Sequence, residues 1–260
     1  TPISIRDAYP SISNITINQN HTWTNGISIG SFAHSGTLYD TGYPYMGDLS
    51  IDYGCNIVVE KGVVLKLSIV RAHDGANFHF EGTEAEPVIL TTWTDDEMGG
   101  DTNCDGPSIG SDGSLSYDIV GFDITFDHVL LRYGYTFHLM SDHFYYSQNT
   151  LNVTDSVFEL CDDDWGALFV GQLDSDNVSV NISNTVFRNN VAGFHSYFTQ
   201  VPGSFLSGCS FINNNQSGAL FEGGISGFTV MNSDFSGNGK AVQVGATSTV
   251  NLGSTVSGGG

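Results

Sequence analysis

The sequence is short of basic residues. It has seven lysines and arginines against 28 aspartates and glutamates, which gives a formal net charge of −21. Nucleic-acid binding needs a cationic patch that neutralises phosphates, and the composition provides none. Carboxylates are good ligands for hard divalent cations. The charge balance therefore excludes nucleic acid as a partner and favours divalent cations.

The sequence also lacks a long uninterrupted apolar run. The longest apolar stretch, NIVVEKGVVLKLSIV, is broken by charges and falls short of the roughly 18 to 20 apolar residues of a membrane-spanning helix. We therefore predict no membrane span. The chain begins at Thr1 without Met and carries no apolar leader, which is the pattern of a mature secreted product. We expect an extracellular protein at a cell surface.

Helical periodicity is missing as well. No ten-residue stretch combines a 3.6-residue apolar spacing with a cap at each end. A helical repeat protein would need much Ala, Leu, Glu, Lys and Arg, whereas this chain has 32 glycines and seven basic residues. These observations exclude a helical solenoid.

A repeat of apolar residues is present instead. Phe158, Phe187, Phe211 and Phe235 recur at intervals of 29, 24 and 24 residues, and Leu130 extends the series back by 28. Each lies in a short segment with bulky residues at alternate positions, bounded by Gly, Asn, Asp or Ser, which is typical of a strand. Self-similarity at this period indicates a solenoid in which each coil covers the next. The sequence therefore predicts an all-β parallel β-helix.

The first 45 residues differ in character from the rest. Alternating Ile-x-Ile segments lead into the turn-rich, tyrosine-bearing stretch HSGTLYDTGYPYMGD. Two interpretations of residues 1–45 stay open: a cap or first coil that shields the end of the stack, or an assembly strand that pairs with another subunit. Residues 46–260 are assigned to the β-helix. Exposed ladders at its ends predict a homo-oligomer or polymer.

Asparagines follow the repeat phenylalanines. They stand at Asn189, Asn190, Asn213, Asn214 and Asn238. Asparagine tolerates the left-handed backbone of a tight turn, and stacked asparagines form amide ladders. We predict that they have a structural role at a corner of the coil.

The four cysteines, at 55, 104, 161 and 209, are far apart and form no CxxC pair. Zinc is therefore not predicted, while one or two disulfides stay open. Cys161 follows its repeat phenylalanine by three residues, whereas Cys209 precedes its own by two. These two cysteines are therefore not expected to face each other in neighbouring coils.

The segment GGDTNCDG has the spacing of a calcium loop. Asp101, Asn103 and Asp105 stand at relative positions 1, 3 and 5, and Gly106 stands at position 6, where such a loop turns sharply. Further candidate ligands are the Pro107 carbonyl at position 7, Asp112 at position 12, and the flanking acids Asp95, Asp96 and Glu97. We predict a structural Ca²⁺ that pins this loop to the coils. The alternative is an acidic turn without an ion.

Three segments resemble the recurring opening of right-handed parallel β-helix surface proteins of bacteria and archaea. They are GDLSIDYGCNIVVEKGVVLKLS, FEGTEAEPVILTTWTDDEMGGDTNCDG and FDHVLLRYG. The resemblance covers roughly residues 47–240 and is most specific in GGDTNCDG. It departs at PSIGSDGSLSYDIV, where the family usually has a tryptophan-containing strand. The resemblance implies a right-handed, single-stranded parallel β-helix and a surface, adhesive or scaffold role.

Two sets of polar residues are candidates for other roles. The run CDDDW, residues 161–165, is interpreted as a solvated corner, with a second ion site or a sugar-facing patch as alternatives. Six Asn-X-Ser/Thr sequons are candidate glycosylation sites: Asn14, Asn20, Asn152, Asn177, Asn181 and Asn215.

Three hypotheses for function remain. The favoured one is a secreted structural or adhesive surface protein, stabilised by calcium, that assembles into a filament, sheath or surface layer. The second is a polysaccharide lyase or glycoside hydrolase acting on acidic glycans. Its candidate groups are Arg132, Arg188, His128, His138, His143, His195 and the aspartates 162–164, while a GxSxG motif is absent.

The third hypothesis is a non-catalytic module that binds an extracellular glycan. Aromatic side chains would serve as stacking platforms for sugar rings. The candidates are Trp93, Trp165, Tyr133, Tyr135, Tyr145 and Tyr146.

Overall fold

The structure is a computed structural model in which the described secondary structure is entirely β-strand. It describes residues 3–5, 26–72, 75–110, 116–120, 122–134, 136–141, 149–172, 178–197, 203–253 and 256–257. The described residues contain no helix that is long and apolar enough to cross a membrane.

One wall of the molecule is a nine-stranded sheet in which every neighbouring pair is parallel. In order along the sheet, its strands are β3 (Gly36–Leu38), β5 (Asn56–Glu60), β7 (Ala76–Glu81), β10 (Phe122–Asp127), β13 (Asn149–Thr154), β16 (Val178–Ser183), β19 (Phe205–Ser207), β22 (Phe228–Met231) and β24 (Val250–Leu252). Buried and partly buried residues alternate along β13 and β16. The two-residue period of the sequence therefore places one face of the strand in the core.

A fifteen-stranded sheet forms the other two walls. The short wall consists of β8 (Val88–Thr91), β11 (Val129–Arg132), β14 (Val157–Glu159), β17 (Val186–Arg188) and β20 (Ser210–Ile212). The long wall consists of β1 (Ile3–Ile5), β2 (Ile27–Phe32), β4 (Tyr45–Ile51), β6 (Val64–Ala72), β9 (Ser116–Val120), β12 (Phe137–Ser141), β15 (Leu168–Gln172), β18 (Ala192–Tyr197), β21 (Ser217–Glu222) and β23 (Lys240–Val244). Strand β6 joins the two walls, because its start pairs with β8 and its end pairs with β9.

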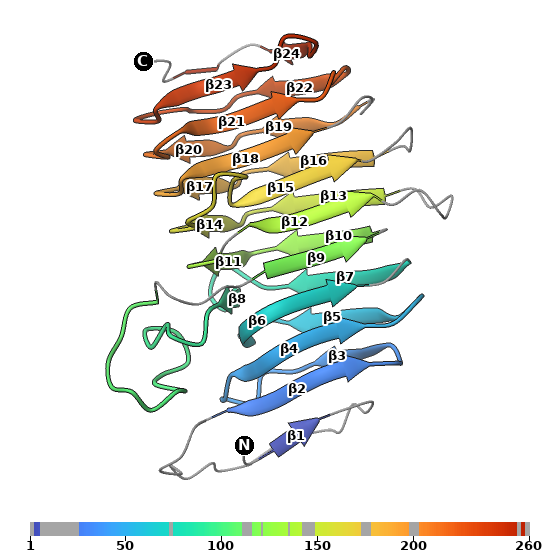
Figure 1. Ribbon diagram of the computed structural model, residues 1–260, viewed down its shortest axis with the longest axis vertical. Helices are drawn as coiled ribbons and strands as arrows, with labels where there is room; N and C mark the ends of the chain where they lie inside the picture. The colour runs from blue at the N-terminus through green and yellow to red at the C-terminus, as the bar shows by residue number, and fades with distance from the viewer. Residues whose placement is uncertain are drawn as a thin grey trace.

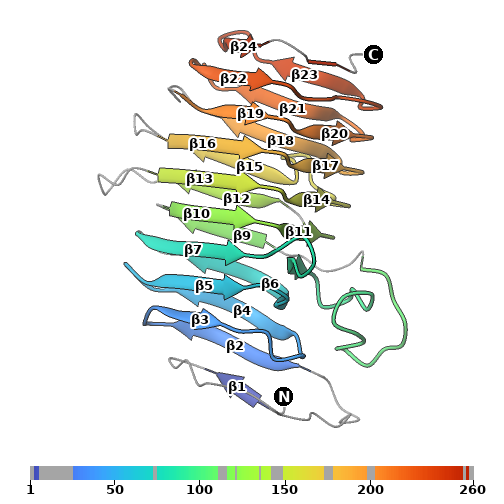
Figure 2. The ribbon, with the colours of Figure 1, turned by 180° about the vertical axis from the view of Figure 1, so that it is seen from behind.

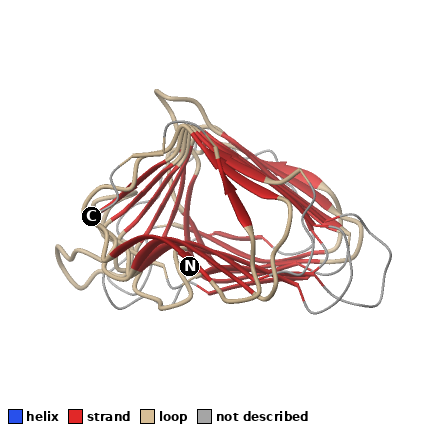
Figure 3. Ribbon diagram, turned by 90° about the horizontal axis from the view of Figure 1, so that it is seen from above, coloured by secondary structure: helices blue, strands red, loops and turns tan. Residues whose placement is uncertain are grey.

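The chain winds through these walls as a right-handed parallel β-helix. Figure 1 shows the strands of the long wall running one way across the front while the coils advance from the N-terminus to the C-terminus. Figure 2 shows the nine-stranded sheet returning in the opposite direction behind it. The view along the axis in Figure 3 shows the strands arranged around the interior. The predicted fold class is confirmed.

The ladders begin before residue 46. Strand β2 pairs with β4, and β3 pairs with β5, so both lie in the coil stack although they belong to the range 1–45. Strand β1 pairs with β2. This part of the expected N-terminal segment therefore continues the solenoid, while residues 6–25 lie outside the described residues.

A column of apolar side chains fills the core beneath the short wall. The rings of Phe158 and Phe187 stack with centroids 5.0 Å apart, Phe187 and Phe211 stack at 4.9 Å, and Phe211 and Phe235 stack at 4.6 Å. The predicted repeat is thus confirmed from Phe158 onwards. Its extension to Leu130 was wrong, because Leu131 is the residue in register with Phe158 and Leu130 faces outwards beside Val157.

Asparagines line the corner that follows the short wall. Asn189 and Asn213 have positive φ angles of 56° and 55°, which asparagine tolerates better than most residues. Asn190 Nδ2 donates to Asn214 Oδ1 at 3.0 Å, and Asn214 Nδ2 donates to Asn238 Oδ1 at 2.8 Å. The predicted amide ladder is therefore confirmed, and each rung ties one coil to the next.

Within the described residues, the four cysteines form no disulfide with one another. Cys55, Cys161 and Cys209 are buried in the core, and Cys104 is exposed in the loop between β8 and β9. Burial raises the pKa of Cys161 to about 12 and that of Cys209 to about 11. The thiols of Cys161 and Cys209 therefore stay protonated and act as small apolar side chains.

Candidate calcium site and neighbouring features

The candidate calcium loop lies between β8 and β9. Figure 1 shows it as the long excursion that leaves the coil stack on one side. We call residues 92–110 the acidic loop. Its glycines make tight turns possible, because Gly99, Gly100 and Gly106 have φ angles of 70°, 80° and 94°. The sharp turn that the spacing predicts at Gly106 is therefore present.

Three carboxylates of the acidic loop come together. Asp96, Asp101 and Asp105 each place a carboxylate oxygen within 4.8 Å of the others. Asp101 is held by the backbone, because its Oδ1 accepts from the Cys104 N–H at 2.6 Å and its Oδ2 from the Gly106 N–H at 3.2 Å. The loop therefore holds together three groups that repel one another when no cation lies between them.

Two oxygens near this cluster have no donor. Asp96 Oδ1 and Asn103 Oδ1 are buried and lack a hydrogen-bond partner, whereas the Asn103 amide donates to Asp105 Oδ2 at 2.8 Å. A buried acceptor without a partner costs about 1–3 kcal/mol. Ca²⁺ takes carboxylate and amide oxygens as ligands. An amide oxygen and a carboxylate oxygen without donors, in and next to a cluster of three carboxylates, meet this requirement. The residues present therefore fit a calcium ion.

The other predicted ligands have different places. Asp95 is fully buried and its Oδ2 accepts from the Thr91 hydroxyl at 2.6 Å, although its Oδ1 has no donor. Asp95 Oδ2 also lies 3.4 Å from Arg132 Nε, and Glu97 Oε2 accepts from Arg132 Nη2 at 2.7 Å. Asp95 and Glu97 thus attach the loop to the coils. Pro107 lies in the loop beyond Gly106, and Asp112 falls outside the described residues.

A buried lysine lies against the acidic loop. The Lys66 ammonium donates to the Gly100 carbonyl at 2.5 Å and to Thr102 Oγ1 at 3.3 Å. Burial lowers the pKa of Lys66, and the nearby carboxylates of Asp96 and Asp95 oppose that shift. Lys66 could not be recognised from the sequence, because a lysine inside the apolar stretch NIVVEKGVVLKLSIV gives no sign of which loop covers it.

Charges also alternate along the outer edge of the short wall. Arg132, Glu159 and Arg188 occupy equivalent positions of β11, β14 and β17. Arg188 Nη2 lies 2.6 Å from Glu159 Oε2, and Arg132 Nε lies 3.7 Å from Glu159 Oε1. The two arginines predicted at equivalent positions are therefore separated by a carboxylate and form an ion-pair ladder.

A second group of titratable side chains lies at the corner between the nine-stranded sheet and the short wall. Asp127, His128 and Asp155 each offer a ligand atom within 4.8 Å of the others. His128 Nδ1 lies 2.7 Å from Asp127 Oδ1, which also accepts from the Thr154 hydroxyl at 3.2 Å. These contacts give the Asp127 carboxylate hydrogen-bond partners within the protein. The group therefore connects neighbouring coils at this corner.

The run CDDDW forms the loop between β14 and β15. Asp162 and Asp164 are exposed, Asp163 Oδ1 accepts from the Trp165 N–H at 2.9 Å, and Asp164 Oδ1 accepts from the Gln216 amide at 2.7 Å. The interpretation as a solvated corner agrees with these contacts. Neither metal-type cluster in the described part of the chain contains these aspartates.

An aromatic cluster lies on the outer face of the long wall. His138, Phe169 and His195 are in register on β12, β15 and β18. The Trp165 ring stacks on His195 with a centroid distance of 5.7 Å and meets Phe169 edge-on at 5.2 Å. Trp165 remains 53% exposed. Of the predicted stacking residues, Tyr135, Tyr145 and Tyr146 lie outside the described residues, as does His143, and Trp93 is exposed in the acidic loop.

His195 makes stability depend on pH. Burial lowers its pKa, and Glu222 Oε2 at 3.5 Å from Nε2 opposes the shift. As pH falls below about 6.5, the unfolded chain binds the proton before the folded chain does, so stability is lost. We expect His195→Leu to lose less stability than the unsubstituted chain between about pH 7 and about pH 5. Denaturant unfolding at each pH measures this, with His79→Leu on β7 as the control, and an equal loss in both variants would contradict it.

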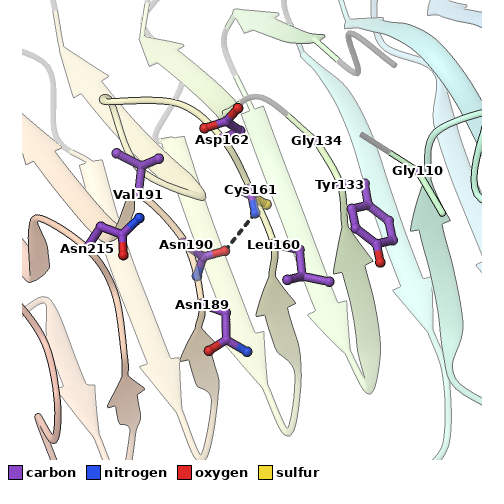
Figure 4. A pocket seen from close by; sticks show the side chains of 10 residues that line it. All are labelled: Gly110, Tyr133, Gly134, Leu160, Cys161, Asp162, Asn189, Asn190, Val191 and Asn215. Atoms are coloured by element: carbon purple, nitrogen blue, oxygen red, sulfur yellow. Dashed lines mark hydrogen bonds between the residues drawn. The ribbon is translucent and has the colours of Figure 1, made fainter. Parts of the chain in front are cut away.

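A cavity of about 280 Å³ lies at the corner between the short and long walls. Figure 4 shows the ten residues that line it: Gly110, Tyr133, Gly134, Leu160, Cys161, Asp162, Asn189, Asn190, Val191 and Asn215. The cavity is therefore formed by four successive coils, those of β11, β14, β17 and β20, and by the end of the acidic loop. We call it the corner pocket.

The described sequons differ in accessibility. Asn152 and Asn181 are partly buried and in register on β13 and β16, where Asn181 Nδ2 donates to Asn152 Oδ1 at 3.0 Å. Asn215 is exposed after the short strand β20. Asn14, Asn20 and Asn177 lie outside the described residues.

Comparisons with known proteins add no family. The chain matches no protein-family model, no curated protein and no solved structure. The resemblance of its segments to surface β-helix proteins stays an expectation from the sequence.

Proposed function

We propose that the chain is a calcium-stabilised β-helical scaffold of a cell surface, which self-associates through the end of its coil stack. The observation that carries the calcium part is the meeting of Asp96, Asp101 and Asp105 within 4.8 Å beside buried oxygens without donors. Bound Ca²⁺ supplies positive charge that offsets the repulsion between these carboxylates. The acidic loop would then be fixed to the coils from both sides, through the ion and through Arg132.

Calcium should raise the melting temperature of the chain. At about 100 times its dissociation constant the ion adds about 2.7 kcal/mol to stability, which is a rise of roughly 5–10 °C for a domain of this size. Asp105→Asn removes one ligand charge and should lose most of that rise. Without calcium the same variant should be at least as stable as the unsubstituted chain, because one repelling carboxylate is gone.

Thermal unfolding with chelator and with excess Ca²⁺ measures both effects. Glu84→Gln, an exposed change of the same charge in the turn before β8, is the matched control and should keep the full rise. The calcium part fails if Ca²⁺ leaves the melting temperature of the unsubstituted chain unchanged.

The assembly part rests on the last coil. Within the described residues, β23 and β24 each pair on one side only, with β21 and β22. Val244 on β23 is 42% exposed and Leu252 on β24 is 54% exposed. An unpaired ladder with exposed apolar side chains is a template for another strand, and a stack that extends end to end gives an open filament.

Electron microscopy and light scattering test this assembly on the calcium-loaded chain. We expect the unsubstituted chain to form end-to-end filaments with rising concentration, and Val244→Lys with Leu252→Lys to stay monomeric, because edge charges oppose strand pairing. Tyr197→Lys, on the side of the stack, is the control and should assemble normally. Monomers of the unsubstituted chain at every concentration would refute the assembly proposal.

A further inference from the structure

The corner pocket has rigid walls. Successive coils hold one another there through the backbone: the Val191 N–H donates to the Cys161 carbonyl at 3.0 Å, and the Asn215 N–H donates to the Asn190 carbonyl at 2.9 Å. The Cys161 N–H donates to Asn190 Oδ1 at 3.0 Å, the bond that is drawn in Figure 4. A ligand would therefore meet a pocket that is already formed, which lowers the entropic cost of binding.

The acidic loop closes the pocket on another side. A Cβ on Gly110 would lie 2.7 Å from Thr92 Oγ1 and 3.1 Å from Tyr133 Cδ2. Only a glycine can pack so closely, so the end of the loop lies directly against the corner of the coil. Tyr133 is fixed in turn by Arg132, whose Nη2 donates to the tyrosine hydroxyl at 2.9 Å.

Polar side chains in the pocket lining are free to bind a ligand. Asp162, Asn189 and Asn215 are exposed, and in the described part of the chain their side chains have no hydrogen-bond partner. The neighbouring Asn190 and Asn214, by contrast, use their amides in the ladder. The pocket thus offers one carboxylate and two amides, which accept and donate hydrogen bonds.

The remaining lining is apolar. Leu160 and Val191 are half-buried, and the ring of Tyr133 adds an aromatic surface. A pyranose matches this combination, because its hydroxyl groups donate to a carboxylate and exchange hydrogen bonds with amides while its C–H face packs on apolar atoms.

The charge of the pocket also restricts which sugars can bind. Among the lining residues that the structure describes, Asp162 is the one charged group, and the chain carries −21 overall, so an anionic sugar would be repelled.

We propose that the corner pocket binds one neutral pyranose unit of a glycan, with Asp162 and Asn215 as its hydrogen-bonding groups. This inference goes beyond the scaffold role and does not rest on it, because the pocket would bind a sugar whether or not the stack assembles. It also differs from the exposed Trp165, which presents a flat ring and not a cavity.

Titration of the full chain with methyl glycosides of glucose, galactose and mannose tests the inference, by calorimetry and by saturation-transfer NMR in the presence of Ca²⁺. The chain should come from a host that adds no N-glycans, because Asn215 lies in a sequon. We expect saturable binding of at least one glycoside and about tenfold weaker binding of glucuronate. Asp162→Ala should weaken binding about tenfold, because a hydrogen bond to a charged group is lost.

Asn215→Ala should weaken binding as well, while Asp164→Ala, a neighbouring exposed aspartate outside the lining, should bind as the unsubstituted chain does. The inference is overturned if none of the three glycosides binds, if Asp162→Ala keeps full affinity, or if glucuronate binds equally well. Such a failure would leave the calcium-dependent rise in melting temperature unchanged, so the two proposals fail separately.

Discussion

Phe187→Ala is expected to lower the free energy of unfolding by about 3–5 kcal/mol. The Phe187 side chain is fully buried, and its ring stacks on Phe158 on one side and on Phe211 on the other, with interplanar angles of 15° and 3°. The substitution therefore opens a cavity and breaks two aromatic pairs, each worth about 0.5–1.5 kcal/mol beyond the buried area. Because coils touch only their neighbours, the gap also weakens the contact between the two halves of the stack.

Urea unfolding measures the loss from Phe187→Ala. Val186→Ala, at the preceding position of β17 and only partly buried, is the matched control and should cost much less. Phe187→Leu should fall between the two, because it keeps part of the apolar volume. Equal losses for Phe187→Ala and Val186→Ala would show that the phenylalanine column does not stabilise the stack as described.

Arg132→Met is expected to cost about 3–5 kcal/mol as well, for an electrostatic reason. The Arg132 guanidinium is buried and pairs with Asp95, which is fully buried, and with Glu97 of the same loop. Methionine fills similar space but leaves Asp95 as an uncompensated charge in the interior. We therefore expect the acidic loop to detach from the coils in the variant.

Arg188→Met is the control for this prediction. Arg188 occupies the equivalent position of β17 and pairs with Glu159, but its side chain is 47% exposed. Solvent screens such a pair, so its removal should cost only about 0–1 kcal/mol. Denaturant unfolding separates the two variants, and proteolysis of the acidic loop should speed up only for Arg132→Met. A loss for Arg132→Met no larger than that for Arg188→Met would contradict the account.

Most of the coil architecture could be predicted from the sequence, because its signals are local and recur. The spacing of Phe158, Phe187 and Phe211 reflects the length of a coil, and the asparagines after them mark the corner where a left-handed residue is needed. The error at Leu130 has a simple cause. In VLLR two leucines are adjacent, and a shift by one residue reverses which side chain faces the core.

The candidate site could be predicted only in part. The predicted calcium ligands Asp101, Asn103 and Asp105 lie close together in the sequence, so their spacing could be recognised there. The separation of Asp95 from Asp96 could not be recognised, because two adjacent carboxylates look alike until the position of Arg132, 37 residues further on, is known. The corner pocket gave no sequence signal, since its lining comes from four coils and the end of the acidic loop.

Calorimetric titration of chelator-treated chain with Ca²⁺ is the most direct test of the claim that the acidic loop is a calcium site. We expect a saturable heat of binding with about one ion per chain, with binding strongly weakened in Asp105→Asn and unchanged in Glu84→Gln. No heat of binding in the unsubstituted chain, or binding that persists unchanged in Asp105→Asn, would contradict it.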